Sequence, residues 1–300
     1  MGWPAPALAA VLAMAQPGPP PTMVQVGRVT VVAWPDEVAL ASRLAQLADQ
    51  PAEWPGLGRR DPGPLRLIVV PIGRFDQFTR RRAPEWGAGV ALPGSRTILL
   101  KADGTDLLQT LRHELAHLAL HEAVRVRVPL WFDEGYAAWA AGEWDRLDAL
   151  RLNLAVVQGQ VPDFRALDGA LRATALTAST AYALATSAVL ELARRNPTRT
   201  LVPLMRRLER GDDFDDAVRA TTGVGLGVFE IEWQRAIRHR YTLFTWLAAG
   251  GVWGICALLL GVAAWARRHR DRGRRAALDE GWEIPEPEGD AVLDPHRTGE

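Results

Sequence analysis

The chain has 300 residues, of which 48% are hydrophobic, and its 35 basic residues balance its 35 acidic ones. This composition favours a globular protein with a substantial core, and the zero net charge argues against a nucleic-acid-binding protein. The single cysteine, Cys256, lies in an apolar run, which excludes an intrachain disulfide and a cysteine-based zinc site, so any metal must be held by histidine and carboxylate ligands.

The N-terminal residues have features of an export signal. A short apolar segment, PALAAVLAMA, ends in Ala13-Met14-Ala15, which is similar to a signal-peptidase cleavage site. It has no basic region before it, so a disordered start is the alternative. We predict a signal peptide over residues 1–15 and a Pro-rich linker over residues 16–27 that builds no core.

The next part of the chain alternates strand and helix patterns. RVTVVAW (Arg28–Trp34) and LRLIVVPI (Leu65–Ile72) are predicted strands, and the second is a continuous apolar run suited to a buried position. Between them, Asp36–Gln50 repeats apolar residues at helical spacing. The order is therefore β-α-β.

Two short extended pieces follow in GAGVALPGSRTILL (Gly87–Leu100), with Pro93-Gly94-Ser95 as a turn signal between them. We predict that the second piece, Arg96–Leu100, is an edge strand that could receive an extended peptide by strand addition. From Asp103 onward, nearly the whole pattern is helical.

LRHELAHLAL (Leu111–Leu120) is a predicted helix with two histidines four residues apart. On a helix, His113 and His117 lie about 40° apart, so both imidazoles can reach one ion while Glu114 flanks the pair. The H-E-x-x-H pattern arises by chance in on the order of one chain of this length in a hundred. An ordinary amphipathic helix with incidental polar residues is therefore the alternative until a third ligand is found.

Glu134, in PLWFDEGYAAWAAG, is the candidate for that ligand. Zinc held by two histidines needs a third protein ligand and an open position for water. Pro129 breaks the chain between two helices, so the second helix can carry Glu134 back to the first. The alternative is that Glu134 is a carboxylate favoured by the dipole at a helix start.

HELAH followed by WFDEGYA resembles the gluzincin clan of zinc metallopeptidases, which is peptidase MA-like, in the branch near the aminopeptidases. That branch reads H-E-x-x-H and then W-x-x-E-G-x-A, and Trp131, Glu134, Gly135 and Ala137 stand in the matching positions. The resemblance covers roughly residues 65–240. It implies one zinc ion per chain, with Glu134 as its third ligand after the two histidines.

The resemblance also implies metal-assisted hydrolysis of a peptide or protein substrate. Zinc bound by His113, His117 and Glu134 would lower the pKa of its bound water, while Glu114 takes the proton and passes it to the leaving amine. The segment Thr180–Ala193 is similar to the helix in which the family places a tyrosine that hydrogen-bonds the tetrahedral intermediate. That residue would be Tyr182 here, although a tyrosine that anchors its helix with a solvated hydroxyl is equally compatible with the pattern.

The sequence departs from the family in two places. The aminopeptidases have a G-x-M-E-N strand whose glutamate holds the substrate amine, whereas GAGVALPG here has no acidic residue, so an endopeptidase is favoured. Thermolysin-like members place a carboxylate four residues after the ligand glutamate to orient a histidine, but Ala138 stands there and the orienting group is unidentified. Asp133 is predicted to cap its helix, and His121 to lie outside the ligand set.

The C-terminal part has the pattern of a membrane anchor. Residues 242–266 carry no charge, and a helix of this length can cross a hydrocarbon core of about 30 Å. Six arginines follow in Arg267–Arg275. We predict one transmembrane helix with the C-terminus in the cytoplasm, a buried core helix being the alternative. Residues 267–300 are predicted to be a basic and then acidic disordered tail.

The sequence thus predicts an α+β fold with a small α/β part (residues 28–102) whose edge strand lies next to the H-E-x-x-H helix. A mostly helical part (residues 103–241) and the transmembrane helix follow. The predicted function is a membrane-anchored, extracytoplasmic zinc metallopeptidase. The alternative is a non-catalytic ectodomain that keeps the fold and serves as a binding or assembly module.

Overall fold

The computed structural model describes most of the chain, in two compact units that divide at residue 245 and are treated separately. The described residues are 19–71, 73–79, 87–104, 106–144, 146–159, 161–241 and 252–279. The predicted signal peptide, residues 1–15, lies outside them.

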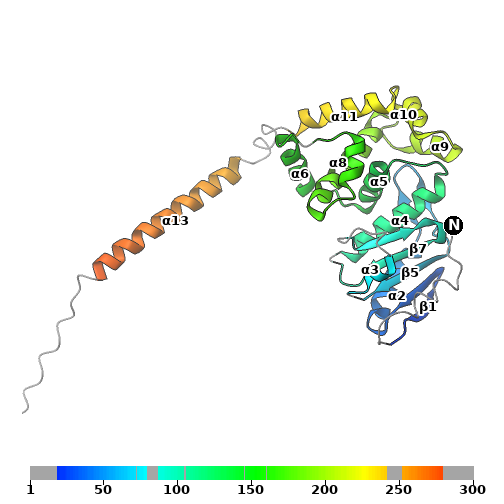
Figure 1. The fold of residues 1–300 in the computed structure, drawn as a ribbon, viewed down its shortest axis with the longest axis horizontal. Coiled ribbons are helices and arrows are strands. Elements are labelled where there is room, and N and C mark those ends of the chain that lie inside the picture. Colours follow the sequence, from blue (N-terminus) through cyan, green and yellow to red (C-terminus); the bar gives the residue numbers. More distant parts are fainter. Residues whose placement is uncertain are drawn as a thin grey trace, which may run out of the picture. The chain divides into compact units, whose positions relative to one another are not determined.

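A five-stranded mixed sheet forms the N-terminal part of the first unit (Figure 1). Its three inner strands are parallel to one another, and an antiparallel strand lies at each edge. In spatial order the strands are β1 (Thr22–Val26), β2 (Val29–Ala33), β5 (Leu65–Val70), β7 (Thr97–Lys101) and β6 (Gly89–Leu92). A separate hairpin pairs β3 (Ala52–Trp54) with β4 (Gly58–Arg60).

Both faces of β5 are buried, which explains its continuous apolar sequence. Alternate residues such as Leu67 and Val69 face α2 (Val38–Ala48) and α4 (Leu107–Ala123). The intervening residues, Ile68 and Val70, pack with Phe75 of α3 (Phe75–Thr79) on the other face. The predicted β-α-β order of this part is confirmed.

Strand β1 corrects the predicted linker over residues 16–27, because Thr22–Val26 belongs to the sheet. Gly27 has a left-handed φ of 56°, which allows the tight turn that brings Val26 opposite Val29. The Arg28 side chain then binds Asp49 at 3.0 Å and ties the turn to the end of α2. Composition alone missed this strand because its partner lies after the turn.

The predicted edge strand Arg96–Leu100 is also wrong in its position. It corresponds to β7, which lies between β5 and β6. The turn at Pro93–Ser95 ends in Arg96 with a left-handed φ of 46°, and it folds Gly89–Leu92 back along the outer side of β7. Among the described strands, the edge strand beside α4 is therefore β6.

The C-terminal part of the first unit is helical, as predicted. Helices α4 and α8 both pack on α5, which lies at the centre of the larger core. Gly135 permits the close approach of α5 to α8, since a Cβ atom there would lie 2.6 Å from the Ala185 backbone. The helices after α4 are α5 (Leu130–Ala141), α6 (Arg146–Val157), α7 (Phe164–Ala170), α8 (Ala175–Arg195), α9 (Val202–Arg210), α10 (Phe214–Thr222) and α11 (Leu226–Arg240).

The second unit contains α13 (Val252–Asp279). This helix continues past the predicted boundary at Ala266 and through the arginine cluster, so residues 267–279 are helical rather than disordered. Arginine, alanine and leucine are strong helix formers, which accounts for the extension. Within the part of the chain that the structure describes, no helix is both long and apolar enough to cross a membrane. Residues 242–251 of the predicted span lie outside that part.

Candidate metal centre and active site

Helices α4 and α5 bring the predicted ligand residues together. Asp106 caps the start of α4 by accepting a hydrogen bond from the Gln109 backbone at 3.0 Å. One side of α4 packs on the sheet through Leu111 and Leu118, and the histidines lie on another side. After the break at Pro129, α5 returns against α4 and carries Glu134 to the histidines.

The three side chains meet through atoms that suit one metal ion. Glu134 Oε2 lies 3.5 Å from His113 Nε2 and 3.7 Å from His117 Nε2. All three candidate ligand atoms lie within 4.8 Å of one another. Ligands at about 2.0–2.1 Å from a tetrahedral zinc ion are separated by roughly 3.4 Å, so the spacing fits such an ion.

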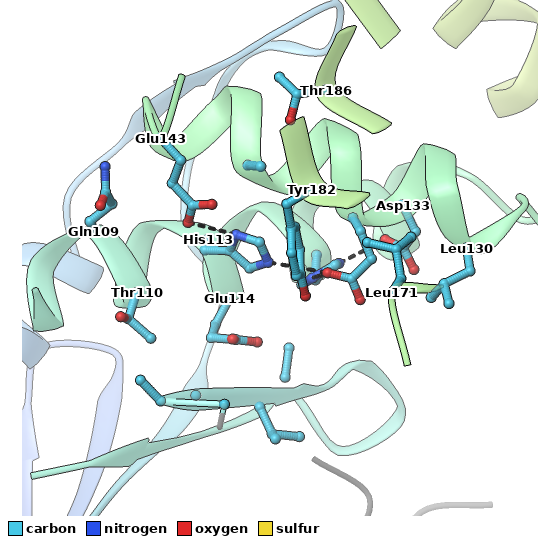
Figure 2. Close-up of a pocket in the computed structure, with 18 of the residues that line it drawn as sticks. Gln109, Thr110, His113, Glu114, Leu130, Asp133, Glu143, Leu171, Tyr182 and Thr186 are labelled. Atoms are coloured by element: carbon cyan, nitrogen blue, oxygen red, sulfur yellow. Dashed lines mark hydrogen bonds and ion pairs between the residues drawn. The ribbon is translucent and has the colours of Figure 1, made fainter. Parts of the chain in front are cut away.

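The second nitrogen of each imidazole is held by a carboxylate. His113 Nδ1 lies 2.8 Å from Glu143 Oε1, and His117 Nδ1 lies 2.7 Å from Asp133 Oδ1. Since an ionised carboxylate only accepts hydrogen bonds, both Nδ1 atoms donate, and both Nε2 lone pairs are left for a metal. Figure 2 shows Glu143 and Asp133 on opposite sides of this cluster.

Asp133 does not cap its helix, which corrects the prediction. The N-cap of α5 is Pro129, four residues earlier, so the Asp133 side chain projects from the first turn toward α4. Its second oxygen, Oδ2, lies 2.8 Å from His121 Nε2. His117, His121 and Asp133 also have the composition of a metal-ligand group, but their close atoms are already joined by these hydrogen bonds.

The carboxylates stabilise positive charge at the imidazoles. Burial lowers the pKa of His113, but its hydrogen bonds to Glu134 and Glu143 outweigh burial and raise this pKa well above its usual value. Burial also opposes charge on His117, whereas Asp133 and Glu134 raise its pKa to about 9. The same negative surroundings favour a divalent cation, and two imidazoles with one carboxylate are a donor set that zinc accepts. The residues present therefore fit zinc.

Glu114 is buried beside the ligand residues, between α4 and the edge strand β6. Burial raises the pKa of Glu114, while the neighbouring His113 and a hydrogen bond from the Ala91 backbone act in the opposite direction. Gly89 of β6 leaves room for this side chain, because a Cβ atom at Gly89 would lie 2.8 Å from Glu114 Oε1. Figure 2 shows Glu114 pointing from its helix toward β6, away from Glu143.

Tyr182 reaches the same cluster from α8. Its ring centroid lies 6.1 Å from that of His113, and its side chain hydrogen-bonds Glu134. Burial and the nearby Glu134 charge raise the pKa of Tyr182 well above its usual value. The hydroxyl therefore points into the candidate site, as Figure 2 shows, and not into bulk solvent.

A cavity of about 740 Å³ contains all of these groups. Strand β6 lines one wall, and α4, α5 and α8 line others. Sequence reasoning missed three of its features: the contacts of Glu143 and Asp133 with the histidines, and the close approach of Gly89 to Glu114. The only sequence signal for Glu143 was the glycine before it, which marks the end of α5 without saying where the next side chain points.

Comparison with known families gives one match. The family model described as the Peptidase MA superfamily matches residues 78–239, which is more than half of the chain and includes every residue of the cluster on α4, α5 and α8. No curated protein matches the chain.

Proposed function

Because the chain belongs to the Peptidase MA superfamily, we propose that it is a zinc-dependent peptidase in which His113, His117 and Glu134 hold the metal ion. The observation that carries this proposal is the approach of both Nε2 atoms to one oxygen of Glu134, at 3.5 and 3.7 Å, inside a cavity. The Nδ1 contacts support it, since they hold the proton of each neutral imidazole on Nδ1 and make Nε2 the atom that can bind a metal.

When bound, zinc supplies Lewis acidity, which activates water at neutral pH and polarises the scissile carbonyl. Glu114 is the proposed general base, which takes a proton from water and delivers it to the leaving amine. Its raised pKa suits this exchange, because a base is most effective when its pKa approaches the working pH. Tyr182 is the proposed donor to the oxyanion that develops on the substrate.

We propose that the substrate is an extended peptide that lies along β6. The outer side of this strand has no partner strand among the described residues, and Gly87–Ala91 line the cavity. Unpaired backbone groups at a sheet edge can hydrogen-bond an extended chain. No acidic side chain lies in this stretch to hold a free amine, which favours an endopeptidase over an aminopeptidase.

The test uses the purified full-length chain and its Glu114→Gln variant. We expect about one zinc per chain by elemental analysis of both proteins, and cleavage of a quenched-fluorescence peptide library by the wild type. The variant should lose about 10²–10⁴-fold in rate, because the amide cannot take a proton. Glu53→Gln is the matched control, since Glu53 is an exposed residue on β3.

Two outcomes would contradict the proposal in different ways. Zinc binding without Glu114-dependent cleavage would support the binding-module alternative. A chain that takes up no zinc would contradict both the metal site and the mechanism.

We further propose that the part of the chain before residue 242 acts outside the cytoplasmic membrane and that residues 242–266 tether it there. The support is the sequence alone: 25 uncharged residues followed by six arginines. Membrane fractionation of expressing cells, followed by protease digestion of cells whose cytoplasmic membrane is intact, tests it. We expect the chain in the membrane fraction and residues 19–241 accessible to added protease; recovery in the soluble fraction would contradict the tether.

A further inference from the structure

We propose that Glu143 is the positioning residue that orients His113 and thereby sets the affinity of the metal site. This inference rests on the proposed function, because it assumes that His113 is a ligand. Glu143 lies nine residues after Glu134, beyond the end of α5, and no part of the sequence pattern assigned it a role.

The contact itself fixes the state of the imidazole. Glu143 Oε1 lies 2.8 Å from His113 Nδ1, which is a normal hydrogen-bond distance. The carboxylate accepts, so the proton of the neutral ring resides on Nδ1 and the Nε2 lone pair faces Glu134 Oε2 at 3.5 Å. Without this acceptor, the proton could move to Nε2, and the ring could rotate about its bond to Cβ.

Hydrogen bonds from α5 and α4 fix the backbone of the turn that carries Glu143. Gly142 adopts a left-handed φ of 75° and ends α5, and the Glu143 backbone N–H donates to the Ala138 carbonyl at 3.0 Å. Two side chains of α4 bind the same turn: Gln109 Nε2 donates to the Gly142 carbonyl at 3.3 Å, and Arg112 Nε to the Ala140 carbonyl at 2.7 Å. The helix that carries His113 therefore also grips the turn that carries its acceptor.

Helix α5 offers no polar side chain one turn after Glu134. That position is Ala138, which is buried and apolar. The acceptor for His113 comes instead from the turn, in the arrangement that Figure 2 shows above the imidazole. His117 has an acceptor of its own, Asp133, so each histidine ligand has a separate carboxylate partner.

The side chain of Glu143 is about one-third exposed, whereas that of His113 is 11% exposed. A change at Glu143 therefore removes few core contacts, which separates an effect on the imidazole from an effect on folding. Outer partners of this kind typically change metal affinity by about 10–100-fold when they are removed.

The experiment measures the zinc dissociation constant of the full-length chain by competition with a chromophoric chelator. It compares the wild type, Glu143→Gln, Glu143→Ala and the control Glu53→Gln. We expect Glu143→Ala to raise the zinc Kd by about 10–100-fold, and Glu143→Gln to raise it less, because the amide oxygen still accepts a hydrogen bond. The control should bind as the wild type does.

Two further readouts separate orientation from folding. The far-UV circular-dichroism spectrum of the metal-free Glu143→Gln protein should equal that of the metal-free wild type, since the two side chains have the same shape and the fold is kept. With cobalt in place of zinc, the visible absorption of the Glu143 variants should shift, because that spectrum reports ligand geometry and a purely structural residue would leave it unchanged.

The outcomes also separate this inference from the proposed function. A wild-type chain without zinc affinity would contradict the proposed function and this inference together. Zinc bound by the wild type and by both Glu143 variants with Kd values within twofold of each other would overturn the role of Glu143 alone. Should Glu143→Ala fail to fold, the isosteric Glu143→Gln variant decides the question.

Discussion

Gly89 of the edge strand β6 lies directly against the proposed general base. Its missing Cβ atom would lie 2.8 Å from both Glu114 Oε1 and Thr110 Cγ2. We expect Gly89→Ala to displace the Glu114 carboxylate and to lower kcat/KM on the order of 10²-fold without loss of zinc. Peptide cleavage and metal content check this.

Gly94 offers the matched control for that substitution. It lies in the turn after β6, and a Cβ atom there would meet nothing within 4 Å. Gly94→Ala should therefore leave kcat/KM unchanged. Equal activity of the Gly89→Ala and Gly94→Ala variants would show that the Glu114 carboxylate does not need the space left by the absent Cβ atom of Gly89.

Replacing Tyr182 tests whether its hydroxyl donates to the oxyanion or only has a structural role. If its hydroxyl donates to the developing oxyanion, Tyr182→Phe should lower kcat by about 10²-fold or more, while zinc affinity changes little. Steady-state kinetics and the chelator titration give the two values. An unchanged kcat would instead indicate that the hydroxyl only holds Glu134 in place.

At the residue scale, the sequence was sufficient for the groups that lie close along the chain. His113, Glu114 and His117 share one helix, so their spacing determines which side chains meet. Glu143 and Asp133 could be read from the sequence, but their contacts could not. Those contacts depend on how α5 lies against α4 and on the turn at Gly142, which a single-helix pattern does not contain.

At the scale of elements, the contact between α5 and α8 depends on Gly135. A Cβ atom there would lie 2.6 Å from the Ala185 carbonyl carbon and oxygen, which are backbone atoms that cannot rotate away. We expect Gly135→Ala to lower the free energy of unfolding by about 1–3 kcal/mol. Urea unfolding measures this difference.

The control is Gly169→Ala in α7, where the added methyl group would meet nothing within 4 Å. Its free energy of unfolding should equal that of the wild type or exceed it by up to about 1 kcal/mol, because alanine favours a helix more than glycine does. Similar values for the two variants would mean that α5 and α8 can separate at no cost.

The sheet shows why strand identity was easier to predict than strand position. Apolar runs predicted β2 and β5, and a turn signal predicted two extended pieces that correspond to β6 and β7. Nothing in Arg96–Leu100 says that its outer side is covered by the preceding strand, so the edge was assigned to β7 instead of β6. Pairing partners are a property of the folded sheet and not of a local pattern.

At the scale of the whole molecule, zinc held by the three proposed ligand residues would join α4 to α5. Bound zinc should therefore stabilise the first unit. A ligand that binds only the native state adds about 2.7 kcal/mol to the free energy of unfolding at a free concentration of 100 times its Kd. We expect zinc to raise the Tm of the chelator-treated chain. In Glu134→Gln, which lacks the ligand carboxylate, the rise should be much smaller, and an equal rise in both proteins would place the ion elsewhere.

The broad architecture was predictable because composition and periodicity report on it directly. The α+β fold followed from three patterns in the sequence: strands β2 and β5, the helix between them and the helical pattern after Asp103. The extent of the C-terminal helix was not predictable in this way, because α13 continues through an arginine cluster that was expected to end it.

The placement of the cluster on α4, α5 and α8 also fixes the order in which synthesis delivers its parts. Both imidazoles and the Glu134 carboxylate leave the ribosome within one short stretch, whereas Tyr182 follows about fifty residues later. The three proposed zinc ligands are therefore synthesised well before the Tyr182 side chain. The proposed donation from Tyr182 to the oxyanion would therefore become available only after α8 has packed against α5 at Gly135.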